Sequence, residues 1–180
     1  MHTIFKILTV CGALLSLSAC ASLSIDGPDY TSVQPTFVLE EFFDGDVKAW
    51  GIVQDRSGEV IQRFEVDIAG SVSDGVLTLD ETFRYGLGSG VEKRIWTINV
   101  GDGKTYTGSA GDIVGQADGQ SFGNAFFWGY EMDLPVGNSK RRVKFADWIW
   151  AFDENTIVNR SYIQKFGITF AEVTIFMRKD

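Results

Sequence analysis

The chain has 180 residues, of which 44% are apolar and 22% are charged, and its formal net charge is −8. This length and composition are typical of one globular domain with a sizeable core. The acidic balance, with no long cluster of lysine and arginine, argues against a nucleic-acid binder and against binding to anionic lipid through bulk charge.

Residues 1–19 have the features of a signal peptide. Lys6 precedes an apolar run from Ile7 to Leu17, which is too short for a comfortable transmembrane helix. The run ends in Leu17-Ser18-Ala19-Cys20. This segment resembles the bacterial lipobox, in which small residues precede a cysteine that is lipidated and becomes the new N-terminus.

The lipobox resemblance implies cleavage after Ala19 and a diacyl lipid on Cys20, which would attach the protein to a membrane. Ala21 is not the aspartate that resembles an inner-membrane retention signal. We therefore expect a bacterial envelope protein, lipid-anchored at the outer membrane and facing the periplasm. An ordinary secretory signal that happens to carry a cysteine is the alternative interpretation.

The histidine and cysteine content excludes several kinds of active site. The only histidine is His2, and the only cysteines are Cys11 and Cys20. Because His2 and Cys11 leave with the signal peptide and Cys20 carries the lipid, the mature domain has no histidine and no free thiol. This excludes Ser-His-Asp and Cys-His catalysis, and zinc or haem held by either residue type. We expect no metal, no cofactor and no disulfide.

Residues 20–36 are predicted to be a lipid-anchored tether, and residues 37–180 a single domain. The stretch from Ala21 to Thr36 contains serine, glycine and proline and has no periodicity, which is typical of a flexible segment. The following FVLEEFF, from Phe37 to Phe43, fits either a short helical turn or an extra strand.

The segment from Val47 to Gly70 predicts two strands joined by a tight turn at Asp55–Gly58. A strand from Val76 to Tyr85 follows, and the Gly86–Gly90 turn leads to its partner. If Tyr85 lies opposite Gly90, Leu79 faces Trp96. In the same register Glu81 faces Arg94 inside the protein, either as an anchor for a polar ligand or as a satisfied internal ion pair. A register slip would instead leave both residues outside.

The rest of the chain predicts further strands. Lys104 to Gly111 is a weaker strand, and Gly115 to Gly123 is polar and loop-like. Apolar residues alternate from Phe126 to Leu134. A hairpin turns about Asp153-Glu154-Asn155, and a final strand runs from Ile168 to Arg178. Eight to ten strands with short turns predict an all-β fold, an antiparallel up-and-down meander that closes into a lipocalin-like barrel.

The hairpin about Asp153 carries large side chains on both faces. If Phe152 lies opposite Thr156, one face brings Asp147 against Ser161 and Ile149 against Asn159. The other face brings Trp148 against Arg160 and Trp150 against Val158. We expect the first face to line a ligand cavity, and the second face, with Trp148, Trp150 and Arg160, to meet lipid or protein. The alternative is that FVLEEFF folds back over this outer patch.

Several segments together resemble a known family. They are the lipobox, AWG-x-x-QDRSG (Ala49 to Gly58), FADWIW (Phe145 to Trp150) and NRSYIQKFG (Asn159 to Gly167). They look like the uncharacterised bacterial lipoproteins catalogued as domain of unknown function three-eight-three-three, which implies a single lipoprotein domain and no particular reaction. A looser similarity to lipocalin-like (calycin) barrels implies that Arg178 packs over Trp50 as a structural plug.

The leading functional hypothesis is a barrel that binds a small apolar or amphipathic ligand. Arg94 would meet a carboxylate or phosphate head group. The second hypothesis is a structural or interaction lipoprotein with a filled barrel. The third is a carboxylate-type hydrolase, although no local spacing of acidic residues singles out a pair. The polar ligand contacts are predicted to come from Glu81, Arg94, Asp147, Asn159 and Ser161.

Cys20→Ser should release the protein from membranes, because the thiol that carries the lipid is lost. Fractionation of cells and mass spectrometry of the purified protein measure this, and Cys11→Ser should leave both results unchanged. A Cys20→Ser variant that still fractionates with membranes, together with a wild type that has no lipid mass, would contradict the anchor.

Overall fold

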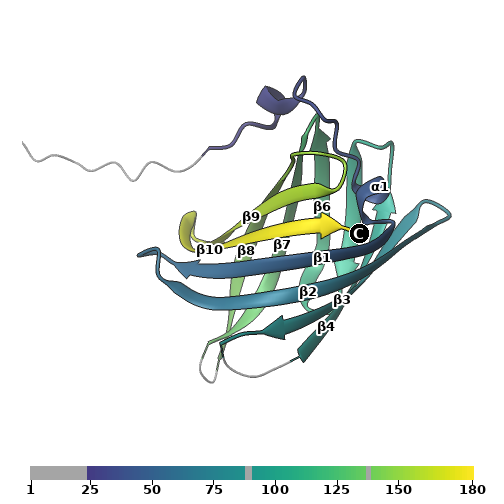
Figure 1. Ribbon diagram of the computed structural model, residues 1–180. Coiled ribbons are helices and arrows are strands. Elements are labelled where there is room, and N and C mark those ends of the chain that lie inside the picture. The colour runs from purple at the N-terminus through teal and green to yellow at the C-terminus, as the bar shows by residue number, and fades with distance from the viewer. Residues whose placement is uncertain (1–23, 88–90, 137–138) are drawn as a thin grey trace, which may run out of the picture.

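The computed structural model describes residues 24–87, 91–136 and 139–180, so the predicted signal peptide and Cys20 lie outside the described residues. Ten antiparallel strands follow one another around a closed barrel, and the first strand pairs with the last (Figure 1). This confirms the predicted all-β up-and-down meander and its closure into a lipocalin-like barrel. The strand number lies at the upper end of the predicted range.

The helices are short, the strands are mostly long, and tight turns join most of them. Two small helices come first, η1 (Gly27–Tyr30) and α1 (Leu39–Phe43). The strands are β1 (Gly45–Asp55), β2 (Val60–Ser73), β3 (Val76–Tyr85), β4 (Val91–Val100), β5 (Thr105–Ala110), β6 (Ile113–Phe122), β7 (Ala125–Val136), β8 (Ser139–Ala151), β9 (Thr156–Lys165) and β10 (Ile168–Lys179). Among the described residues, no helix is long and apolar enough to cross a bilayer.

The β1–β2 hairpin forms where the sequence predicts it. The Asp55 carboxylate accepts hydrogen bonds from the backbone N–H groups of Ser57 at 2.8 Å and Glu59 at 3.0 Å, which fixes the turn. Phe64 and Val66 on β2 are buried in the barrel, and Glu65 between them is exposed. This alternation is what a strand with one buried face requires.

Two predicted registers are confirmed. In the β3–β4 pair, Leu79 lies opposite Trp96 and Glu81 opposite Arg94. In the β8–β9 pair, Asp147 lies opposite Ser161, Ile149 opposite Asn159 and Trp148 opposite Arg160. Both registers follow from the turn length, because a shift by one residue would move every side chain to the other face.

The predicted loop from Gly115 to Gly123 was wrong, since most of it lies in β6. Polar and glycine residues have low strand propensity. In the barrel, however, β6 pairs with β5 on one side and β7 on the other, and a bulge between Val114 and Asp118 adjusts its register. Backbone pairing on both sides outweighs the local preference. Ala117 and Gly119 face inward, and a Cβ at Gly119 would lie 2.4 Å from the Trp128 ring of β7.

The FVLEEFF segment closes one end of the barrel. Its helix α1 lies at the end where β1 begins and β10 finishes (Figure 1). Phe37, Leu39, Phe42 and Phe43 are all buried in the core. Glu40 accepts a hydrogen bond from the Tyr106 hydroxyl on β5 at 2.9 Å, and the Lys179 ammonium on β10 donates to the Glu41 carbonyl at 2.6 Å. The alternative that this segment covers the outer aromatic patch was therefore wrong.

The outer patch is covered instead by η1, which belongs to the predicted tether. The Tyr30 ring lies 6.4 Å from the Trp148 ring and 6.1 Å from the Trp150 ring, measured between centroids. Trp148 also packs against Phe127 and Phe122 and is only 8% exposed. The part of the predicted tether that forms η1 thus packs on the barrel. This contact removes the aromatic side chains on the outer face of β8 from water.

This packing also corrects the predicted interaction patch. Trp148 is buried and Trp150 is half-buried, so neither presents a free indole to a partner. Arg160 is exposed, but its guanidinium forms an ion pair with Glu172 and lies over the Tyr162 ring. The three residues therefore hold β8, β9, β10 and η1 together.

The predicted plug of Arg178 over Trp50 was wrong. On β1 the inward positions are Val47, Ala49 and Gly51, so Trp50 points outward and is 41% exposed. Its ring packs on Phe176 of β10, with centroids 6.1 Å apart. Arg178 is exposed on the same outer face. The strict alternation of β1 decides this, because a residue next to a buried alanine cannot enter the barrel.

Gly70→Ala should destabilise the domain by about 1–3 kcal/mol, because a Cβ at Gly70 would lie 1.6 Å from the Phe43 carbonyl oxygen and push α1 off the barrel end. Urea unfolding followed by circular dichroism measures the loss. Gly111→Ala is the matched control, since nothing lies within 4 Å of a Cβ there. Equal stability of both variants would show that α1 is not packed against β2.

Candidate functional site

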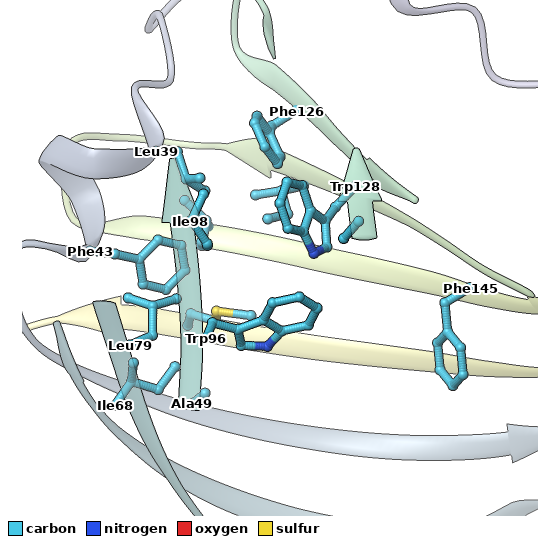
Figure 2. Packing of buried hydrophobic residues seen from close by; sticks show 14 of the residues in the cluster. Leu39, Phe43, Ala49, Ile68, Leu79, Trp96, Ile98, Phe126, Trp128 and Phe145 are labelled. Atoms are coloured by element: carbon cyan, nitrogen blue, oxygen red, sulfur yellow. The ribbon is translucent and has the colours of Figure 1, made fainter. Parts of the chain in front are cut away.

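The barrel encloses a cavity of about 520 Å³ along its axis. Leu39 and Phe43 of α1 form its closed end, and Tyr85, Leu134 and Pro135 line it at the other end. Figure 2 shows the indoles of Trp96 and Trp128 in the interior, beyond Leu39 and Phe43; their centroids are 5.6 Å apart in an edge-to-face arrangement. Ten strands make a barrel wider than the eight-stranded kind that side chains just fill.

Two glycines allow Trp128 to lie flat against the wall. A Cβ at Gly119 of β6 would lie 2.4 Å from the Trp128 ring, and a Cβ at Gly108 of β5 would lie 2.9 Å from it. Without side chains at these positions, the large indole occupies the wall rather than the axis. The cavity therefore depends on small residues in β5 and β6 as much as on the large residues of β7.

A layer of polar side chains lies at mid-height, on five strands. On β3, Glu81 comes between Leu79 towards α1 and Phe83 towards the mouth, and β7, β8 and β9 have the same order of apolar, polar and apolar positions. On β4, Arg94 comes between Trp96 and the acidic Glu92. The layer consists of Glu81 on β3, Arg94 on β4, Tyr130 on β7, Asp147 on β8, and Asn159 and Ser161 on β9. The structure thus brings all five predicted ligand-contacting residues to one cavity.

Arg94 is already engaged within the protein. Its Nε donates a hydrogen bond to the Asp112 carboxylate at 3.0 Å, and its guanidinium lies 5.5 Å from the centroid of the Phe83 ring. Glu81 lies across the strand pair from Arg94, as predicted, but the hydrogen-bonded ion pair is with Asp112. A carboxylate or phosphate head group would therefore have to compete with Asp112 for this arginine.

Two carboxyl groups in the layer have pKa values well above those of ordinary carboxyls. Burial raises the pKa of Glu81 to about 7, although the positive charge of Arg94 partly opposes the shift. Burial likewise raises the pKa of Asp147 to about 7, against the opposing effects of the Ser161 and Tyr130 hydroxyls and of Arg94. One buried oxygen of each, Oε2 of Glu81 and Oδ1 of Asp147, has no hydrogen-bond partner among the described residues.

The other polar groups of the layer are fixed. The Asn159 side-chain amide donates to the Trp148 carbonyl at 3.2 Å, and Ser161 Oγ donates to Asn159 Oδ1 at 3.2 Å. Both residues are almost fully buried. Burial also raises the pKa of Tyr130 well above its usual value, so its hydroxyl stays neutral and able to donate. The layer therefore combines neutral hydrogen-bonding groups with two carboxyls that lack full partners.

Sequence reasoning did not assign Tyr130 and Asp112 to the site. Tyr130 shares the inward face with Phe126 and Trp128, and this alternation was a sufficient signal for including it. Asp112 lies in the turn between β5 and β6. Because β6 was not predicted, nothing in the sequence placed that turn beside Arg94.

The comparisons with known proteins identify the family of the chain. A family model described as a protein of unknown function (DUF3833) matches residues 14–179. The chain belongs to this family. The match covers the barrel, α1, η1 and Cys20, so the DUF3833 domain includes the whole closed barrel. No curated protein matches the sequence significantly.

The raised pKa values of Glu81 and Asp147 make the free energy of unfolding depend on pH. An unfolded chain has ordinary carboxyl pKa values, so between about pH 4 and pH 7 the folded protein binds more protons than the unfolded one. The stabilisation is fully present below about pH 4 and is lost as pH rises through about 7. The free energy of unfolding should therefore fall between pH 5 and pH 8, by roughly 3 kcal/mol for each group.

Glu81→Gln and Asp147→Asn should each remove a large part of this fall, because the neutral amides carry no charge to bury at pH 8. Urea unfolding at pH 5 and pH 8 provides the measurement. Glu131→Gln, on the exposed outer face of β7, is the control and should retain the slope of the wild type. An unfolding free energy that rises from pH 5 to pH 8 in the wild type would overturn the assignment.

Proposed function

We propose that this protein is a lipid-anchored protein of the bacterial cell envelope that holds one small, mainly apolar molecule inside its barrel. The observation that carries the proposal is the cavity of about 520 Å³, which the side chains of the barrel do not fill. Pockets of about 300–1,000 Å³ enclose most of the surface of a small ligand. One such molecule fits within this barrel.

The composition of the walls supports the same proposal. Leu79, Trp96, Trp128 and Ile149 provide an apolar surface on the α1 side of the polar layer, and Phe83 and Phe145 provide one on the mouth side. Binding sites for small molecules combine such surfaces with a few placed polar groups that orient the ligand. The partnerless oxygens of Glu81 and Asp147 are groups that a ligand would satisfy.

The anchor is part of the proposal and is supported by the sequence. Cys20 at the end of the lipobox would carry the lipid, and the outer membrane facing the periplasm is the proposed location. The first described residues lead directly into η1, which packs on the barrel, so few residues separate Cys20 from the folded domain. The barrel would accordingly be held close to the membrane surface.

The interaction lipoprotein with a filled barrel receives less support. Its two features were a barrel packed with side chains and an exposed aromatic hairpin. The cavity argues against the first, and the cover of Trp148 by Tyr30 argues against the second.

A carboxylate-type hydrolase is the second candidate function, because Glu81 and Asp147 have pKa values of about 7 in a cleft. Carboxyls with such values are suited to exchange protons near neutral pH. This candidate differs from a binding protein in one measurable way. A bound molecule recovered from the barrel after prolonged incubation has an unchanged mass if the protein only binds it, and a changed mass if the protein hydrolyses it.

Binding should be visible with N-phenyl-1-naphthylamine, a neutral apolar dye whose emission rises in an apolar site. We expect one dye per barrel and quenching of tryptophan emission, since Trp96 and Trp128 line the cavity. Val53→Trp fills the cavity from β1 and should abolish binding. Ile52→Trp is the matched control, because the neighbouring residue points outward and leaves the cavity unchanged.

Circular dichroism establishes that both tryptophan variants are folded. If the wild type binds no apolar dye, or if Val53→Trp and Ile52→Trp bind it equally well, the barrel does not hold the ligand and the proposal falls.

A further inference from the structure

The cavity has an excess of acidic groups. Among the described residues that line it, five are acidic and one is basic. The acidic residues are Glu81, Glu92, Asp112, Asp133 and Asp147, and the basic residue is Arg94. Any ligand that enters the barrel therefore meets more negative than positive groups.

The groups near the mouth are satisfied by protein partners. Asp112 receives the Arg94 hydrogen bond, and both oxygens of Asp133 accept from Arg142 at 2.9 Å. Glu92 accepts a hydrogen bond from the Tyr85 hydroxyl at 3.1 Å. The two carboxyls of the polar layer, Glu81 and Asp147, lack full partners among the described residues. In the strand order, β4 with Arg94 and β7 with Tyr130 lie between β3 with Glu81 and β8 with Asp147.

Aromatic rings lie on both sides of these two carboxyls. Trp96 is edge-to-face with Tyr130 at 5.4 Å between centroids, and Tyr130 is stacked on Phe145 at 4.9 Å. The faces of such rings attract cations, most strongly where water is excluded. Rings and buried carboxyls together form the kind of surroundings in which proteins hold ammonium groups.

We infer that the molecule held in this barrel is a cation with an apolar body, whose protonated amine or quaternary ammonium group lies between Glu81 and Asp147. The inference rests on the proposed binding function and adds the charge of the ligand to it. An anionic head group would meet an arginine that is already paired and two carboxyls that repel it. A neutral body without a donor would neither donate a hydrogen bond to the two carboxyls nor balance their negative charge.

Binding of a cation should be linked to pH. The groups that face the two carboxyls are Arg94 and Asp112 from the β4 side, Tyr130 from β7, and Ser161 from β9. The two carboxyls themselves, Glu81 and Asp147, change charge near neutral pH, because burial raises the pKa of each to about 7. The ionised fraction of each carboxyl rises about tenfold from pH 6 to pH 8, so the affinity of a cation that binds the ionised forms should rise by at least about tenfold. Binding should also release protons.

Three probes of equal chain length test the charge: decyltrimethylammonium, decanol and decanoate. The change in tryptophan emission of the full chain on titration with each probe gives the affinity at pH 6 and pH 8. We expect decyltrimethylammonium to bind most tightly at pH 8 and decanoate most weakly. The decanol affinity should be the same at both pH values.

Glu81→Gln and Asp147→Asn should each weaken decyltrimethylammonium roughly tenfold at pH 8 and leave decanol within about twofold. The matched control, Glu131→Gln on the outer face of β7, should behave as the wild type. If decanoate binds best, or if all three probes bind equally at both pH values, the cation inference is wrong while the binding function stands. If none of the three probes binds, and the neutral dye does not either, the binding function itself fails.

Discussion

The pairing of β1 with β10 is the interaction on which the rest of the structure depends. It joins the first and last strands of the meander and leaves no sheet edge among the ten strands. Once the sheet is closed, every strand has one face inside and one face outside. The alternation of the sequence then sorts the side chains, and the cavity, the polar layer and the outer aromatic face all follow from this sorting.

The polar layer lowers the stability of this arrangement. Charged groups lose the solvation of water when they are buried, and an incomplete set of partners does not restore it. Asn159 and Ser161 are satisfied by the protein, whereas Glu81 and Asp147 are only partly satisfied. A core that served stability alone would place apolar side chains at these positions. The proposed ligand would supply the partners that these two carboxyls lack.

The sequence was most informative where the alternation and the turn length agreed. The hairpins β3–β4 and β8–β9 have short turns and clear apolar faces, so their registers, and with them the inward position of all five candidate residues, were predictable. The closure into a barrel was also predictable, because a long meander without helices leaves edges that must be hidden. The function of the site was less accessible, since the partner of Arg94 comes from a turn beyond β4.

The errors have identifiable physical causes. The segment of β6 is polar and rich in glycine, and its strand exists because its neighbours supply the pairing. Trp50 was placed by its similarity to a calycin tryptophan, although Val47, Ala49 and Gly51 already occupied the inner face of β1. Tyr30 lies in a stretch without periodicity, and local sequence does not show that a lone aromatic residue will cover Trp148 on a distant strand.

Under the proposed function, the position of α1 at one barrel end means that a bound molecule enters and leaves at the opposite end, where Tyr85, Leu134 and Pro135 line the cavity. A molecule that enters must leave by the route it came, and a second molecule cannot push the first one through. Delivery and release of the ligand would therefore use the same end of the barrel at different times. A partner that delivers the ligand and a partner that removes it would accordingly compete for binding at this end of the barrel.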